Sequence, residues 1–344
     1  MIKTKITEMF GIKHPIFAAP MGPYFTKELT VAVSEAGGMG VISHTNLLGK
    51  DSLKAMKEDM EYVVEHTDKP FGFNIRTGRM QFDAKTLCRQ IPKFIMENPK
   101  LREQCVYALT SAGSSKSLPQ SRNFQILREK SGIKHFHVAP ASWLADKCVA
   151  SGVDGMVVTG SEGGGHQSYE KTGTLVLLQE VIQNHPDFPV IACGAFGTGY
   201  GLAAALGMGA GAIAMGTRFI ASQESEFHPK YKELVPPAKP QDTILVTGFL
   251  GPIRLWKNQY ALNHGLIDSR EEKMAEESEF TMEDLLEDGK HYESVYLDGD
   301  LVTGAIPLGQ SCGLVYSIDK VKDIIESIVK IAESRLKNVS SYIQ

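Results

Sequence analysis

One short stretch of the sequence joins three consecutive glycines to a histidine. Residues 159–173 read TGSEGGGHQSYEKTG, so His166 follows Gly163, Gly164 and Gly165 directly. Histidine can accept or donate a proton near neutral pH. Glycines remove side-chain bulk, which lets a planar ligand lie against the backbone. We therefore interpret His166 as a proton-transfer residue, and we expect it on a loop rather than in a regular element.

Two neighbouring segments predict a phosphate site. The apolar runs PVIACG (189–194) and GAIAMG (211–216) each end in glycine, and each is followed by a helical pattern. Glycine lets the backbone approach a ligand closely, and the start of a helix offers unpaired N–H groups that suit phosphate. A tight turn alone would explain either glycine. The same arrangement at two adjacent strand ends favours a bound phosphate group.

Three other histidines are better explained by structural roles than by catalysis or metal binding. His44, His135 and His137 lie on or next to apolar runs. The pair at 135 and 137 has no evident third ligand, and the five cysteines show no CxxC spacing. The sequence therefore predicts no metal site.

The reactive residues need a scaffold, and the chain predicts a (βα)8 barrel, an α/β fold of the TIM type. Continuously apolar runs alternate with helical patterns, as expected for parallel strands buried on both faces. A doubly wound open sheet is the competing interpretation, but eight strands of similar length favour the barrel. The expected strands are 15–21, 39–44, 70–75, 105–111, 134–140, 155–160, 189–194 and 211–216.

Two charged segments interrupt this alternation. Residues 76–102 are rich in Arg and Lys. They are expected either to form a solvated face or to bind an anionic ligand. Residues 223–310 contain an acidic stretch and are expected to form a smaller, mainly helical substrate or lid domain. The barrel would then comprise residues 1–222, with 76–102 as a basic insertion, and residues 311–344, where an amphipathic helix packs back on the barrel.

Composition excludes several classes of partner. The 344 residues carry a net charge of −4, which gives no case for nucleic acid or an anionic membrane. No apolar run approaches the roughly 20 residues that cross a bilayer, and the N-terminus lacks the apolar core of a signal peptide. Scattered, unpatterned cysteines suggest reduced thiols. We expect a cytoplasmic protein.

The motifs together resemble the nitronate monooxygenase family, formerly the 2-nitropropane dioxygenases, which includes FMN-dependent enoyl-acyl-carrier-protein reductases and FMN quinone reductases. The resemblance covers roughly residues 10–320. Among the segments that carry it are Ala19-Pro20-Met21-Gly22, Gly72-Phe73-Asn74, Glu162-Gly163-Gly164-Gly165-His166, Met215-Gly216-Thr217-Arg218-Phe219 and Gly309-Gln310-Ser311-Cys312-Gly313.

The resemblance implies FMN bound across the barrel mouth, with His166 as the catalytic residue. Pro20, Met21 and Gly22 would lie beside the isoalloxazine, and Asn74 and Gln179 would make polar contacts. The phosphate would be held by Gly194, Ala195, Ala214, Met215, Gly216 and Thr217. The remaining implied cofactor contacts are Ala19, Glu162, Gly164 and Gly165.

The sequence leaves three functions open. The first is oxidation of alkyl nitronates with O2. The second is NAD(P)H-dependent reduction of an enoyl thioester or a quinone, in which Arg254 and Asn258 are further candidates for binding an anionic group. The third, a flavin-binding regulator without turnover, predicts no proton-transfer residue, so His166 counts against it. Every enzymatic reading implies a small-molecule substrate. The oligomeric state stays open, with a homodimer as one option.

Overall fold

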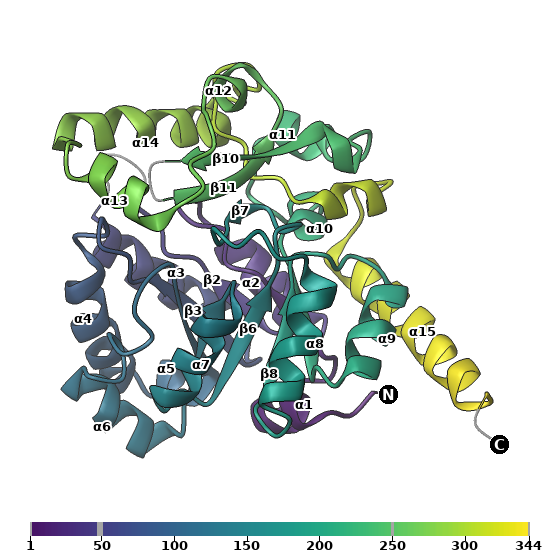
Figure 1. The fold of residues 1–344 in the computed structure, drawn as a ribbon. Helices are drawn as coiled ribbons and strands as arrows, with labels where there is room; N and C mark the ends of the chain where they lie inside the picture. Colours follow the sequence, from purple (N-terminus) through teal and green to yellow (C-terminus); the bar gives the residue numbers. More distant parts are fainter. Residues whose placement is uncertain (1, 47–50, 249–250, 343–344) are drawn as a thin grey trace.

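Eight parallel strands form the wall of a closed barrel (Figure 1). The computed structural model describes residues 2–46, 51–248 and 251–342. Strand pairing follows the order β1-β9-β8-β6-β5-β4-β3-β2, and a parallel bridge between Phe17 and Met39 joins β1 to β2, so the ring closes. This confirms the barrel over the open sheet. The strands are β1 (Ile16–Ala18), β2 (Gly40–Ile42), β3 (Phe71–Arg76), β4 (Cys105–Ser111), β5 (Lys134–Ala139), β6 (Gly155–Thr159), β8 (Val190–Cys193) and β9 (Ala212–Met215).

Helices cover the outside of this wall and bury their apolar faces against it. Their starts are fixed by local chemistry: the Asp51 carboxylate accepts hydrogen bonds from the backbone N–H groups of Leu53 and Lys54 (2.9 and 3.1 Å) and so caps α3. The outer helices are α2 (Lys27–Glu35), α3 (Ser52–His66), α4 (Ala84–Glu97), α5 (Pro99–Gln104), α6 (Arg122–Ser131), α7 (Ser142–Ala150), α8 (Thr174–Asn184), α9 (Gly199–Met208) and α15 (Val321–Ser340).

Aromatic side chains fill the amino-terminal end of the barrel. Helix α1 (Lys5–Phe10) inserts Phe10 among Phe17, Tyr107 and Phe136, with ring centroids 5.3–5.7 Å apart. Edge-on and tilted contacts of this kind are favourable packing arrangements. Because this end is filled, a ligand has access only from the carboxyl ends of the strands, where (βα)8 enzymes place their sites.

Residues 223–310 lie over that open end (Figure 1). The segment is mainly helical, as expected, but it also holds the strands β10 and β11, which were not anticipated. They form an antiparallel three-stranded sheet with β7 (Gly165–His166). Its division from the barrel as a separate domain stays a prediction. The elements here are α11 (Pro229–Leu234), η1 (Pro240–Asp242), β10 (Thr243–Gly248), β11 (Gly251–Trp256), α12 (Gln259–Leu262), α13 (Arg270–Glu277) and α14 (Met282–Leu297).

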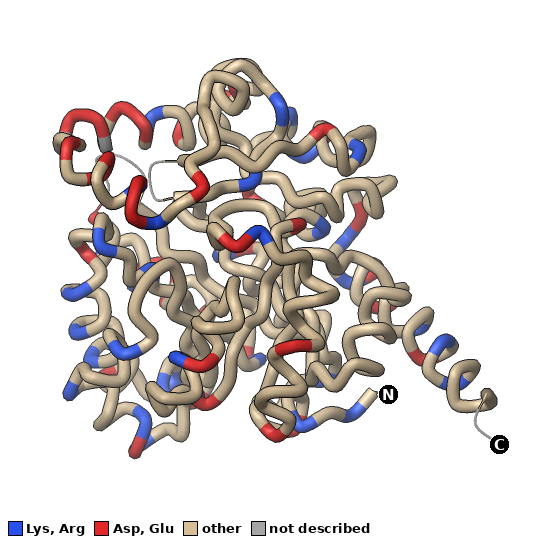
Figure 2. The backbone as a smooth tube through the Cα atoms, in the orientation of Figure 1, with Lys and Arg blue, Asp and Glu red and all other residues tan. Residues whose placement is uncertain are grey.

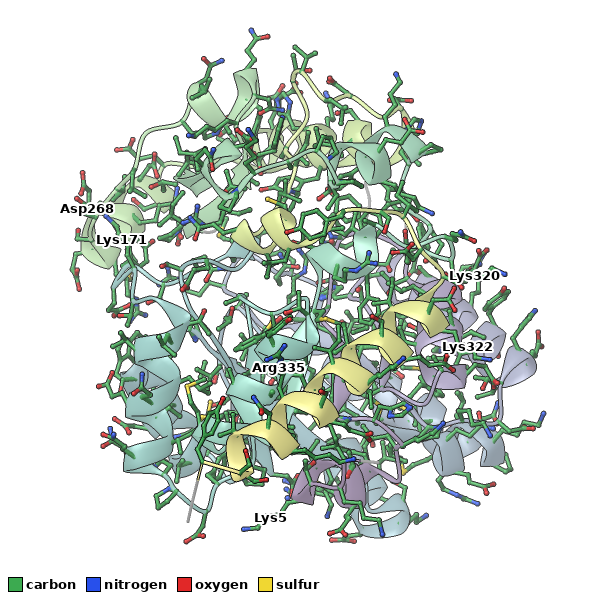
Figure 3. All side chains as sticks on the ribbon, turned by 90° about the vertical axis from the view of Figure 1, so that its right-hand side faces the viewer. Lys5, Lys171, Asp268, Lys320, Lys322 and Arg335 are labelled. Atoms are coloured by element: carbon green, nitrogen blue, oxygen red, sulfur yellow. The ribbon has the colours of Figure 1, made fainter. Side chains whose placement is uncertain are left out.

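Acidic and basic residues are distributed differently between residues 223–310 and the barrel. Figure 2 shows acidic residues gathered on α13 and α14, with basic residues on the outer helices of the barrel beneath them. The carboxy-terminal helix α15 packs against α9 and α2, as expected, and Arg335 lies 4.8 Å from the Tyr200 ring (Figure 3). None of the described helices is both long enough and apolar enough to span a membrane.

Candidate active site

A cavity of about 1150 Å³ lies between the barrel mouth and residues 223–310. This volume exceeds the roughly 300–1,000 Å³ typical of small-molecule sites, so it leaves room for a cofactor together with a substrate. Most of the expected site residues line it: Ala19, Pro20, Met21, Gly22, Asn74, Gly164, Gly165, His166, Gly194, Ala214, Gly216 and Thr217. The residues that carry the resemblance are therefore brought together in space.

The ends of β8 and β9 form an open backbone cradle. Gly194 has a φ of +96°, a conformation that favours glycine. A Cβ built on Gly216 would come no closer than 3.7 Å to any neighbour, the nearest being Met21 Sδ, so space is left in front of this backbone. Helix α9 has ten residues, whereas α10 (Thr217–Ile220) is a single turn. The second turn therefore offers N–H groups rather than a strong helix dipole. This geometry fits a phosphate group.

The three glycines before His166 are required for two structural reasons, close packing and backbone conformation. A Cβ on Gly163 would lie 2.8 Å from Gln167 Nε2, and one on Gly164 would lie 2.6 Å from the backbone nitrogen of Gly309. Gly165 faces open space but has a φ of +81°. Two of the glycines thus permit close packing of the loop against protein, and the third permits its turn. The expected reason, room for a planar ligand, applies to Gly165 alone.

His166 belongs to a regular element, which corrects the expectation of a loop. In β7 it pairs with Ile253 of β11, and the N–H of Gln167 donates to the Pro252 carbonyl at 2.7 Å. The side chain lines the cavity. Burial, and secondarily the guanidinium of Arg76, lower the pKa of His166 to about 4. The imidazole is therefore neutral at neutral pH, with a nitrogen free to accept a proton.

The end of β3 carries a connected polar network. His44 Nδ1 accepts the backbone N–H of Arg76 at 2.9 Å, and its Nε2 lies 3.0 Å from Asp83 Oδ2. That carboxylate also accepts from Ser52 Oγ at 2.6 Å. Since Nδ1 is occupied as an acceptor, the proton resides on Nε2, and burial lowers the pKa of His44. His44 therefore holds the backbone of Arg76 in place, in keeping with a structural role.

His135 and His137 share one partner inside the barrel wall. The Thr110 hydroxyl lies 2.7 Å from His135 Nε2 and 2.7 Å from His137 Nδ1. Burial lowers the pKa of His135 to about 3 and that of His137 to about 4. No cluster of His, Cys, Asp and Glu suited to a metal ion occurs among the described residues. Both side chains are neutral, buried and hydrogen-bonded, and His137 also lines the cavity.

Four expected cofactor contacts do not line the cavity. Gln179 is exposed on the outside of α8, and its Nε2 donates to the Leu175 carbonyl at 2.8 Å. The Glu162 carboxylate accepts from the N–H and the hydroxyl of Thr174 (2.7 and 2.9 Å) and so caps α8. Met215 is fully buried, and Ala195 packs against the main core.

Arg254 and Asn258, expected as candidates for anion recognition, are engaged by the protein. Arg254 Nε donates to the Ser161 carbonyl at 2.6 Å, and its Nη1 donates to Thr243 at 3.0 Å. Asn258 Nδ2 donates to the carbonyls of Leu301 and Gly304 (3.1 and 2.7 Å). Neither residue lines the cavity. Arg254 instead ties β11 to the loop that leads to His166.

The basic stretch 76–102 does not act as one surface. Arg76 reaches the cavity, whereas Arg79 lies at its rim and pairs with Glu277 at 2.7 Å. The other basic side chains lie on or beside the outer helices α4 and α5. A second ion pair, Lys171 with Asp268, also links a barrel loop to the segment before α13 (Figure 3). These two ion pairs link residues 223–310, the covering layer, to the barrel.

Sequence reasoning missed several cavity residues. Tyr24 and Tyr292, which belong to the same packed cluster, also line the cavity, as does the thiol-bearing Cys193. Burial raises the pKa of Cys193 to about 11, so the thiol stays protonated and is not a ready nucleophile. Tyr24 lies only three residues after Met21. This nearness in sequence is the one signal that would have placed Tyr24 among the predicted site residues.

Comparisons with known proteins agree with this geometry. The family model "Nitronate monooxygenase" matches residues 3–330. A relative from Mycobacterium tuberculosis, "(3aS,4S,5R,7aS)-5-hydroxy-7a-methyl-1-oxo-octahydro-1H-indene-4-carboxyl-CoA dehydrogenase", is 28% identical over 100% of this chain and 99% of its own. A "Probable nitronate monooxygenase" from Staphylococcus saprophyticus is 27% identical over 75% of this chain and 80% of its own.

A solved structure covers the same range. FabK from Thermotoga maritima is 31% identical, with a TM-score of 0.82 over 100% of both chains. The family match spans nearly the whole chain, and it joins a barrel whose mouth carries the expected glycines and histidine. The chain therefore belongs to the nitronate monooxygenase family, a family of flavin-dependent oxidoreductases, which confirms the expected class of enzyme.

Proposed function

We propose that the chain binds FMN across the barrel mouth and oxidises alkyl nitronates with O2. The glycine cradle at Gly194 and Gly216 would hold the phosphate, and Ala19 to Gly22 would line the isoalloxazine. The observation that carries the proposal is His166, a neutral imidazole on the cavity wall. FMN would supply electron acceptance from the substrate and electron transfer to O2.

The protein's own residues have limited tasks in this reaction. His166 would accept the α-proton of a neutral nitroalkane, and would orient a nitronate that arrives already ionised. Residues 223–310 lie over the cavity, and the pairs Arg79–Glu277 and Lys171–Asp268 link them to the barrel. In the overall reaction, two nitronate ions and one O2 give two carbonyl products and two nitrite ions.

A reductase is the second candidate. The Mycobacterium tuberculosis relative is named for a CoA thioester, and the cavity is large enough for a long acyl chain. In that reaction NAD(P)H would be the reductant and His166 would stand near the site of proton delivery.

Anaerobic mixing separates the two reactions. The FMN-loaded protein is mixed in turn with NADH, NADPH and propionate 3-nitronate while the flavin absorbance is followed. We expect rapid bleaching by the nitronate alone. Rapid bleaching by a nicotinamide, with none by the nitronate, would replace the monooxygenase proposal with the reductase.

A further inference from the structure

The cavity has a second polar end, opposite the glycine cradle. In the closed ring of strands, β8 and β9 are neighbours, and β3 and β4 lie across the barrel from them. Arg76 ends β3 and lines the cavity there. A cofactor whose phosphate rests at β8 and β9 would therefore have its substrate-facing part between that cradle and Arg76.

Two buried hydrogen-bond donors at this end have no acceptor. Arg76 Nε and the Tyr24 hydroxyl are both shielded from solvent and unpartnered within the described residues. Both side chains line the cavity, and a Cβ built on Gly22, two residues before Tyr24, would lie 3.6 Å from Arg76 Cζ. A buried donor without an acceptor carries a desolvation penalty, so such groups in a cavity wall mark where a ligand oxygen belongs.

The charge at this end is only partly compensated. Burial lowers the pKa of Arg76 to about 10, which still leaves the guanidinium charged at neutral pH. Its Nη2 donates to the neutral side-chain amide of Asn46. Asp83 contributes the nearby negative charge, with its Oδ2 engaged by His44 and Ser52 and its Oδ1 buried without a partner, but it forms no ion pair with Arg76. No ion pair of Arg76 occurs in the described part of the chain.

We propose that Arg76 and Tyr24 form a subsite for a planar two-oxygen anion, the nitronate group of the substrate. The proposal rests on the proposed function. The guanidinium presents donors in a fixed fork that matches two oxygens on one atom, and Tyr24 adds a third donor. His166 and Arg76 line the same cavity. An anion held at Arg76 would then share that cavity with His166.

The test uses probes that bind without reacting. Isobutyrate has the same heavy-atom connectivity as propane-2-nitronate and the same planar two-oxygen anion, and isobutyramide is its neutral counterpart. Their dissociation constants are measured by calorimetry on the FMN-loaded protein. We expect Arg76→Met to weaken isobutyrate by about 10- to 100-fold, as for a lost charge-assisted hydrogen bond, and to leave isobutyramide unchanged. Arg76→Lys keeps the charge without the fork and should fall between.

Two further variants complete the design. Tyr24→Phe removes one oxygen and should weaken isobutyrate by about 5-fold, which keeps the proposal testable if Arg76→Met does not fold. Arg89→Met, on the exposed face of α4, removes the same charge far from the cavity and should change nothing.

Equal effects of Arg76→Met on isobutyrate and isobutyramide would overturn the subsite, as would full isobutyrate affinity in both Arg76→Met and Tyr24→Phe. A change in flavin affinity without a change in isobutyrate affinity would assign Arg76 to the cofactor instead. Because isobutyrate binding requires no turnover, these results stand apart from the fate of the proposed function.

Discussion

The substitution Gly164→Ala tests how the loop before His166 is held. A Cβ at this position would lie 2.6 Å from the nitrogen of Gly309 and 2.9 Å from the carbonyl carbon of Leu308. Both are backbone atoms, so no side-chain rotation can relieve the contact. The loop is also tied there by the N–H of Gln310, which donates to the Glu162 carbonyl at 2.9 Å.

The expected cost follows from that contact. The two backbones must separate by roughly half an ångström, and overpacking of this kind costs about 1–3 kcal/mol of unfolding free energy. His166 lies two residues further on and would move with the loop. Because a displacement of about 1 Å can cost 100-fold in rate, we expect kcat to fall by roughly 10-fold or more.

The assay combines denaturant unfolding with steady-state turnover at saturating FMN. Gly207→Ala is the matched control, because a Cβ there meets nothing within 4 Å on the exposed side of α9. It should retain full kcat and gain about 0.5–1 kcal/mol, as alanine does over glycine in a helix. A Gly164→Ala protein with the stability and kcat of the wild type would refute the packing argument.

The remaining predictions concern the cradle and the buried histidines. Gly216→Ala adds a Cβ that would lie 3.7 Å from Met21 Sδ, an ordinary contact, so the protein should fold normally but purify with less FMN; a flavin content equal to that of the wild type would exclude this cradle. His135 and His137 have pKa values lowered by burial to about 3 and about 4, against 6.5 when unfolded, so the folded state binds fewer protons below pH 6.5 and loses stability as the pH falls. Each histidine should cost about 2 kcal/mol on going from pH 7.5 to pH 5. Denaturant unfolding at the two pH values measures this loss, and a flat profile would mean that the pair is not held neutral.

The eight barrel strands could be predicted because each is a continuous apolar run, such as PVIACG or GAIAMG, that needs no partner to be recognised. The glycines at their ends also predicted the cradle that we propose for a phosphate group. The pairing that holds His166 could not be predicted, since β7 has only two residues and exists through its contact with β11. The paired residues, His166 with Ile253 and Gly165 with Arg254, lie far apart along the chain. Strand pairing of this kind is a tertiary contact with no local signature.

Side-chain direction was the other limit. Arg76 and Arg79 belong to the same basic stretch, yet one enters the cavity and the other pairs with Glu277 at the rim. Gln179 lies on a helix that packs against the barrel, but its side chain faces solvent. Spacing along the sequence places a residue on an element, and only the packing of that element decides what the side chain meets.

The most direct test of the account concerns His166 and the proton it accepts. Wild-type protein and His166→Ala, both loaded with FMN, are mixed anaerobically with neutral 2-nitropropane or with its preformed nitronate, and flavin bleaching is timed. We expect His166→Ala to bleach roughly 100-fold or more slowly with the neutral compound and to stay within about 10-fold of the wild type with the nitronate. Equal slowing with both compounds, or none with either, would contradict a proton-accepting role for this histidine.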